Sequence, residues 1–299
     1  MAKQPPAAAP GWIDRLLAYM DGDDPATELS KVRAFQWIFV LIVCTEYWAR
    51  ATPQGNDLHV SNWVALPLVT ALGVATLSKG WGRLGFAGLA VMQSVRIWND
   101  FPGVGNHSYL ELLLCLVCAF LDIRQRQERM LFLRTVRWMT CVVFFFAGIQ
   151  KVVHGYYFRG EILAYSISID AFKPFLHALF PADDYLRLSQ YQGKAGDGPY
   201  LVSSWLVVLL SNGTYLFEMG LVPLLVWRRT RALAVVSGLV FLLSIESAAR
   251  EIFFGLIYVN MLLVFFERDV NRRVLPVYAA VLACMLLVRL KVLPEVIFY

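Results

Sequence analysis

The chain has 299 residues, of which 58% are hydrophobic and 16% charged, and its formal net charge is +5. Soluble domains carry about a quarter charged residues, so this composition excludes an ordinary soluble protein and indicates a polytopic helical membrane protein. The small positive charge is spread over the loops, which argues against a nucleic-acid partner and leaves the lipid bilayer as the expected environment.

The apolar runs predict an all-α bundle with about nine membrane spans. A polar arm comes first, over residues 1–33, with a surface helix expected from Trp12 to Met20 and no signal-peptide pattern. Residues 34–299 are expected to form a single transmembrane domain. The predicted spans are 34–49, 63–77, 84–98, 108–121, 131–153, 200–227, 232–247, 252–266 and 274–290. Between the fifth and sixth spans lies a non-spanning segment, 154–199, with an amphipathic stretch over 161–180.

Basic residues gather in alternate loops of this predicted topology. They include Lys79, Arg83, Arg124, Arg126, Arg129, Arg134, Arg137, Arg228, Arg229, Arg231, Arg268, Arg272 and Arg273. Because loops rich in lysine and arginine stay on the cytoplasmic side, we expect a cytoplasmic N-terminus and an external C-terminus. Segment 154–199 then lies on the extracytoplasmic face, and the location that fits best is a bacterial inner or plasma membrane.

Ionisable side chains recur near the predicted outer ends of the spans. They are Glu46, Arg96, His107, Glu111, Lys151, His154, Glu246, Arg250 and Glu251, with Glu218 inside the sixth span. A charge at the bilayer centre costs about 2.5–3.5 kcal/mol on insertion scales, so such residues usually face the interior of the bundle. His107 and Glu111 are four residues apart on one helix, so their side chains can meet.

Lys151 ends an aromatic, apolar run that begins at Phe144. Two interpretations of this lysine are open. Its long side chain can extend to the lipid headgroups, or it can turn inward, lose water and become a usable base.

Three stretches resemble vitamin K-dependent gamma-glutamyl carboxylase and the wider HTTM-domain family of membrane proteins. The first is Phe146-Ala147-Gly148-Ile149-Gln150-Lys151 with Gly155 and the aromatic turn to Gly160. The second is Asn106-His107-Ser108-Tyr109-Leu110, followed by an apolar run to Asp122. A weaker third match covers Glu218 to Phe266. Two features depart from the family: residues 243–246 lack a histidine expected there, and no counterpart of the large lumenal domain follows the ninth span.

The resemblance implies a membrane enzyme that uses a reduced naphthoquinone of the vitamin K or menaquinone type, oxygen, and carbon dioxide or bicarbonate. Lys151 would be the base that deprotonates the quinol, and His107 would assist it. Residues implied to bind the quinone or a peptide substrate are Asn106, Tyr109, Trp98, Phe145, Tyr156, Glu218 and Glu246, with Phe144, Phe145, Phe146 and Trp98 as walls of an apolar pocket. No metal ligands are predicted.

Two other interpretations are open. The chain could be a membrane component of a peptide or toxin maturation system that works beside a soluble partner protein, without turnover at Lys151 and His107. Alternatively, Cys115 and Cys118, three residues apart on one helix face, could act as a thiol–quinone redox pair, although small packing residues in a membrane helix are the more ordinary interpretation.

Overall fold

The computed structural model describes residues 25–51, 60–103, 105–168, 177–191, 200–249, 252–266 and 270–289, and all regular structure within these ranges is helical. The all-α prediction is therefore confirmed. The helices are α2 (Pro25–Ala51), α3 (Val60–Leu77), α4 (Gly82–Asp100), α5 (Asn106–Phe120), α6 (Arg126–His154), α7 (Glu161–Ser168), α9 (Ala182–Ser189), α10 (Trp205–Val226), α11 (Arg231–Ala249), α12 (Ile252–Leu263) and α13 (Val270–Arg289).

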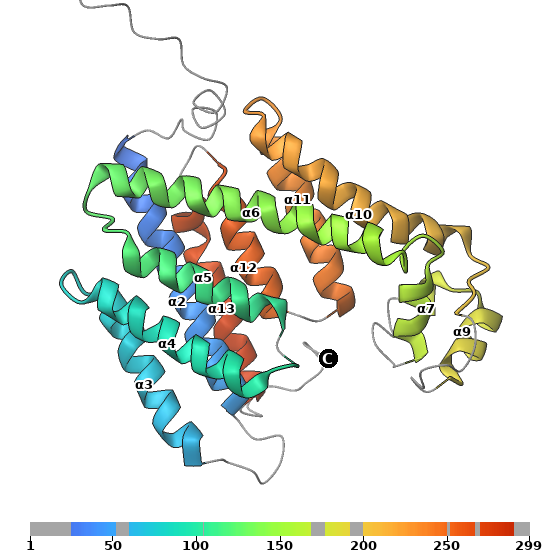
Figure 1. Ribbon diagram of the computed structural model, residues 1–299, viewed down its shortest axis with the longest axis horizontal. Helices are drawn as coiled ribbons and strands as arrows, with labels where there is room; N and C mark the ends of the chain where they lie inside the picture. Colours follow the sequence, from blue (N-terminus) through green and yellow to red (C-terminus); the bar gives the residue numbers. More distant parts are fainter. Residues whose placement is uncertain are drawn as a thin grey trace, which may run out of the picture.

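The helices form a main bundle and a smaller lobe (Figure 1). In the bundle, α2 packs against α3 and α13, and α4 packs against α3 and α5. Helices α6 and α10 run side by side along the bundle and extend past it to α7 and α9, which form the lobe. The lobe has its own small core, in which Ala164 and Ile167 of α7 meet Leu188 of α9 and Val207 of α10.

Three helices are long and apolar enough to cross a membrane, over Thr27–Ala49, Arg126–His154 and Trp205–Val226. Shorter apolar helices cover Val64–Leu77, Asn106–Phe120, Arg231–Ile245 and Phe253–Leu263. Each of the nine predicted runs overlaps one helix, so the runs were correctly identified as helical. Membrane crossing by all nine helices, and the orientation of the termini, stay predictions.

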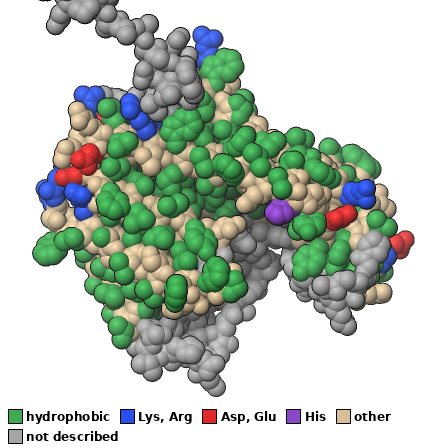
Figure 2. Space-filling view, in the orientation of Figure 1, with side chains coloured by type: hydrophobic (Ala, Val, Ile, Leu, Met, Phe, Trp, Pro, Cys, Tyr) green, Lys and Arg blue, Asp and Glu red, His purple; other side chains and the backbone are tan. Residues whose placement is uncertain are grey.

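The surface is largely apolar on the face shown in Figure 2, where lysine and arginine side chains gather toward the upper left. On α10 and α11 the large apolar side chains Leu209, Leu216, Val236 and Leu243 are each more than half exposed. The connections between α3 and α4, α5 and α6, and α10 and α11 lie on the upper and left side of the bundle (Figure 1). These loops carry Lys79, Arg124 and Arg228, so the predicted basic loops share one side.

Helix α2 begins at Pro25, nine residues before the predicted span at Ala34. The apolar pattern misses this extension because its polar side chains are buried by specific contacts rather than by apolar packing. Lys31 is fully buried and donates a hydrogen bond from Nζ to the carbonyl oxygen of Phe266, at 2.6 Å. Proline is also favourable in the first turn of a helix, where its missing N–H is not needed.

Other differences concern segments flanking the bundle. The amphipathic stretch predicted over 161–180 contains α7, which ends at Ser168, and residues 169–176 lie outside the described ranges. The predicted surface helix from Trp12 to Met20 also lies outside them. Arg137, predicted near a cytoplasmic loop, is instead buried on α6, where its guanidinium donates to the carbonyl oxygen of Val264 at 2.9 Å. It thereby satisfies a carbonyl group just after α12, which an apolar helix end would leave without a donor.

Candidate functional site

Helices α6 and α10 approach each other closely at Gly148. A Cβ atom at this position would lie 2.5 Å from Cγ of Met219 and 3.0 Å from the backbone oxygen of Tyr215. Only glycine permits this contact without displacing backbone. Lys151 follows Gly148 by three residues and therefore points to the same side of α6, toward α10.

Helix α6 ends at His154, three residues after Lys151. Gly155 has a φ of 71°, and its N–H donates to the carbonyl oxygen of Lys151 at 3.2 Å. Glycine at this position is the common helix C-cap because it adopts the left-handed conformation without strain. The ammonium group of Lys151 lies in the last turn, where the partial negative charge of the helix terminus favours a cation.

Lys151 and Glu218 form the centre of what we define as the lysine site, which also includes Tyr157 and Tyr258. Nζ of Lys151 donates to both carboxylate oxygens of Glu218, at 2.8 Å and 2.7 Å. The Lys151 side chain is 19% exposed and that of Glu218 7% exposed. The structure therefore supports the inward interpretation of Lys151, and its partner is a carboxylate on α10.

The turn after α6 places an aromatic ring over the ammonium group. Nζ of Lys151 lies 5.5 Å from the centre of the Tyr157 ring, a cation–π contact. Helix α10 fixes this turn, because the hydroxyl of Ser211 donates to the carbonyl oxygen of Tyr157 at 2.8 Å. Ser211 and Glu218 are seven residues, or two turns, apart, so one face of α10 supports both the turn and the ion pair.

Electrostatics in the lysine site disfavour a further negative charge. Burial, together with the nearby negative charge of Glu218, raises the pKa of Tyr157 to about 12. Tyr258 of α12 also interacts electrostatically with Glu218, and its ring packs edge-on against Phe144 of α6, with the ring centres 5.6 Å apart. Tyr157 therefore keeps its proton at neutral pH.

A second polar group, which we define as the arginine cluster, comprises Glu46, Arg96, His107 and Glu111. The guanidinium of Arg96 on α4 contacts Glu46 of α2 at 2.6 Å and Glu111 of α5 at 3.4 Å. Nε2 of His107 lies 3.3 Å from Oε1 of Glu46. Both glutamate side chains are fully buried. One ligand atom from each of Glu46, His107 and Glu111 lies within 4.8 Å of the others, so His107 and Glu111 lie near each other on α5.

The structure does not bring Lys151 and His107 into one site. Lys151 is held by α10, whereas His107 is held by α2. In Figure 1 the C-terminal end of α6 extends toward α7, well apart from the start of α5. The two residues predicted to act together therefore belong to separate groups of side chains.

The predicted apolar pocket is not formed by the four rings expected to line it. Phe144 is buried, whereas Phe145, Phe146 and Trp98 are 41%, 56% and 84% exposed. Successive residues on a helix are about 100° apart, so three consecutive phenylalanines cannot line one wall. Trp98 lies about 200° from the buried Arg96 on the same helix, which turns it outward.

The remaining predicted binding residues are peripheral to both groups. Asn106 is exposed, and Tyr109 and Tyr156 are 41% and 57% exposed. The side chain of Glu246 on α11 lies outside the described part of the chain, as do Arg250 and Glu251. Cys115 and Cys118 are free thiols buried in the main core.

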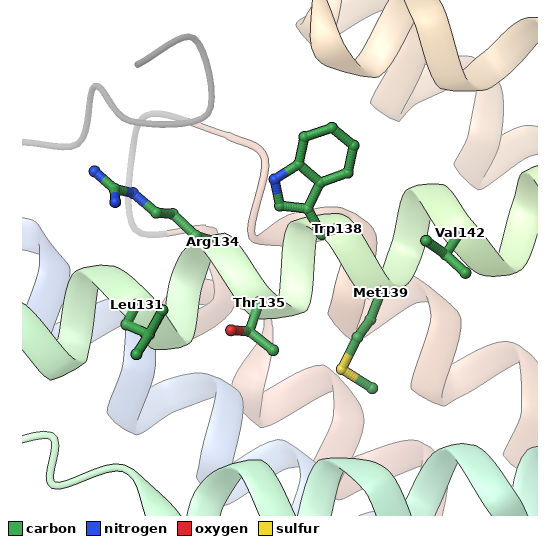
Figure 3. Close-up of a pocket in the computed structure, with 6 residues that line it drawn as sticks. All are labelled: Leu131, Arg134, Thr135, Trp138, Met139 and Val142. Carbon is green, nitrogen blue, oxygen red and sulfur yellow. The ribbon is translucent and has the colours of Figure 1, made fainter. Parts of the chain in front are cut away.

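A groove of about 400 Å³ runs along the middle of α6, away from either group. Figure 3 shows its lining, all from α6, with Trp138 pointing to the opposite side from Met139. The lining residues are Leu131, Arg134, Thr135, Trp138, Met139 and Val142. It contains none of the predicted site residues.

Sequence reasoning missed Gly148 as a packing residue, and it missed Tyr157, Tyr258 and Gln93 as members of the two polar groups. Nε2 of Gln93 donates to Oε2 of Glu111 at 2.7 Å. Helical spacing could have indicated two of them, because Gly148 and Gln93 each lie three residues before a buried cation. Nothing in the sequence pairs Tyr258 with Glu218, which is 40 residues away.

Comparisons with protein-family models, curated proteins and solved structures found no match to this chain.

Proposed function

We propose that this chain is a membrane-embedded enzyme of the carboxylase-like type, in which the lysine site removes a proton from a weakly acidic hydroxyl group such as that of a reduced quinone. The observation that carries the proposal is the contact of Lys151 with both oxygens of Glu218, largely shielded from solvent. Apolar helix exteriors and the basic loops on one side support a membrane location with the lysine site toward the outer face.

The ion pair gives Lys151 a route to its basic form. Transfer of one proton from the ammonium group to the carboxylate converts two opposite charges into an amine and a carboxylic acid. This conversion is far less costly in apolar surroundings than in water, because it removes the expense of keeping two charges poorly solvated. The amine of Lys151 can then accept a proton from a hydroxyl group placed against it.

The product of that step is an anion beside a newly formed ammonium group. Lys151 stabilises this anion directly, since the charges attract strongly where water is largely excluded. The Tyr157 ring lies over the ammonium group, and a flat aromatic surface beside the base suits a planar ligand. A bound reduced naphthoquinone would supply, through its reaction with oxygen, the strong base needed for carboxylation with carbon dioxide or bicarbonate.

The test is turnover of reduced menaquinone to its epoxide by the purified full chain in detergent, with and without oxygen. We expect oxygen-dependent epoxide from the wild type, and a loss of about 10²–10⁴-fold with Lys151→Ala or Glu218→Gln, the range for removal of a general base. His154→Ala is the matched control, since it removes an exposed basic side chain from the same helix turn. Equal turnover in all variants, or none in the wild type, overturns the proposal. In the latter case, co-purification of a soluble protein would indicate the maturation role instead.

A further inference from the structure

We propose that Glu46, His107 and Glu111 of the arginine cluster form a binding site for a divalent first-row transition metal. This inference is independent of the lysine site and differs from the sequence-based expectation of no metal ligands. Its basis is the placement of one imidazole and two carboxylates from α2 and α5 with their ligand atoms within 4.8 Å of one another.

The spacing fits a small metal ion. Zinc–nitrogen and zinc–oxygen bonds of about 2.0–2.2 Å in a tetrahedral arrangement put neighbouring ligand atoms about 3.4 Å apart. Nε2 of His107 and Oε1 of Glu46 are 3.3 Å apart. All three ligand atoms lie within 4.8 Å of one another. An imidazole among the ligands favours zinc, iron, copper or nickel over calcium or magnesium, which take oxygen ligands.

The chemistry of the buried side chains also fits a divalent metal. Two fully buried carboxylates, Glu46 and Glu111, lie beside an imidazole, and Arg96 contacts both of them. Buried charges are retained in apolar surroundings when they are paired or coordinate a metal, and this group provides both kinds of partner.

The neighbouring side chains provide orientation and access. Gln93 holds Oε2 of Glu111, and the Ser108 hydroxyl lies 3.1 Å from Arg96, so outer contacts fix the carboxylate and its guanidinium partner, as is usual around metal ligands. His107 keeps 16% of its side chain exposed, which gives an ion an entry path at the start of α5.

The test is metal retention by the full chain, purified in detergent without a polyhistidine tag, stripped with chelator and incubated with Zn²⁺. After gel filtration, elemental analysis is expected to find about one Zn²⁺ per chain. His107→Ala should weaken retention at least about a hundredfold, because it removes a direct ligand, whereas loss of an outer contact alone costs 10–100-fold. Because His107 is the least buried ligand, this variant is expected to fold. His154→Ala, which removes an exposed imidazole, is the matched control and should retain zinc.

A second measurement needs no variant. Zn²⁺ should raise the thermal unfolding temperature of the wild type in proportion to its concentration, since a ligand that binds only the folded state stabilises it. Mg²⁺ at equal concentration should not. Absence of retained zinc in the wild type, equal retention by His107→Ala, or equal stabilisation by Mg²⁺ overturns the proposal.

Discussion

Removal of either partner from the Lys151–Glu218 pair should destabilise the fold by unequal amounts. At the observed separation of about 2.7 Å, two unit charges attract by about 6 kcal/mol at an effective dielectric constant of 20, and desolvation offsets much of this. Lys151→Met leaves the 7%-exposed carboxylate without its counter-charge. Glu218→Met leaves an ammonium group that is 19% exposed and that can extend toward water. The lysine variant should therefore be the less stable of the two.

The loss of stability in Lys151→Met has an upper limit, because the carboxylate of Glu218, once it lacks its counter-charge, can take up a proton. From an ordinary glutamate pKa of about 4.3, neutralising it at pH 7 costs about 3.7 kcal/mol, and at pH 5 only about 1 kcal/mol. We therefore expect Lys151→Met to lose about 3–4 kcal/mol at pH 7 and about 1 kcal/mol at pH 5. The double variant, with two apolar side chains of similar length, should lie within about 1 kcal/mol of wild type at both values.

The assay is equilibrium unfolding of the purified chain in mixed detergent micelles, followed by tryptophan fluorescence at both pH values. The four proteins form a double-mutant cycle, which isolates the coupling between the two side chains. Additive single-variant effects would refute the reasoning. An equal loss of unfolding free energy in Lys151→Met at pH 5 and pH 7 would also refute it, because a buried carboxylate without its counter-charge must titrate.

Three further outcomes follow from the same contacts. Gly148→Ala should lower the free energy of unfolding in detergent by about 1–3 kcal/mol, because its Cβ meets the backbone of α10. The control is Gly220→Ala, which has open space around its Cβ and should be neutral or stabilising. Lys151→Arg should abolish quinol epoxidation nearly as fully as Lys151→Ala, because a guanidinium is effectively never deprotonated; retained turnover would exclude the base role. In the lobe, burial opposes ionisation of Asp184, but hydrogen bonds from Ser203 and from Arg187 lower its pKa overall. The contribution of the ionised carboxylate to the stability of the lobe is therefore complete above the unfolded pKa of about 3.9 and is lost as the pH falls through the lower pKa of the folded state. Pepsin itself is more active at pH 3 than at pH 5, so cleavage is compared with that of an unfolded substrate at the same pH. On this relative scale the lobe should be cut faster at pH 3 than at pH 5, and Asp184→Asn should remove that difference.

The helices were predictable from the sequence because each apolar run is long and bounded by turn or charged residues. The boundaries were less so, and α2 shows why. Its first turns carry Glu28 and Lys31, which read as an exposed arm, yet both side chains are buried. Lys31 donates a hydrogen bond to the carbonyl oxygen of Phe266, 235 residues away. The sequence around Lys31 does not predict a contact with a residue so distant in the chain.

The sequence identified the polar residues of the candidate sites, but it did not predict which of them lie together. Lys151, Glu218, His107 and Glu111 were each identified as costly polar residues in apolar helices, and all four have buried or partly buried partners. Which of them meet depends on helix packing, which periodicity alone does not give. The three-phenylalanine wall failed for a simpler reason, since a run of consecutive apolar residues shows that a helix is apolar all round and does not identify the side that faces a ligand.

The lysine site and the arginine cluster both hold buried carboxylates, but with different partners. We therefore expect different chemistry at the two groups. In the lysine site one cation faces one carboxylate, so the pair can become neutral by moving a single proton, and it needs no further ion. In the arginine cluster a guanidinium, which does not give up its proton, faces Glu46, Glu111 and Asp100. Arg96 therefore cannot serve as a base, whereas the imidazole and the two carboxylates beside it are ligand types that bind a transition metal. Proton transfer is therefore expected at Lys151, cation binding at His107, and loss of one property should leave the other intact.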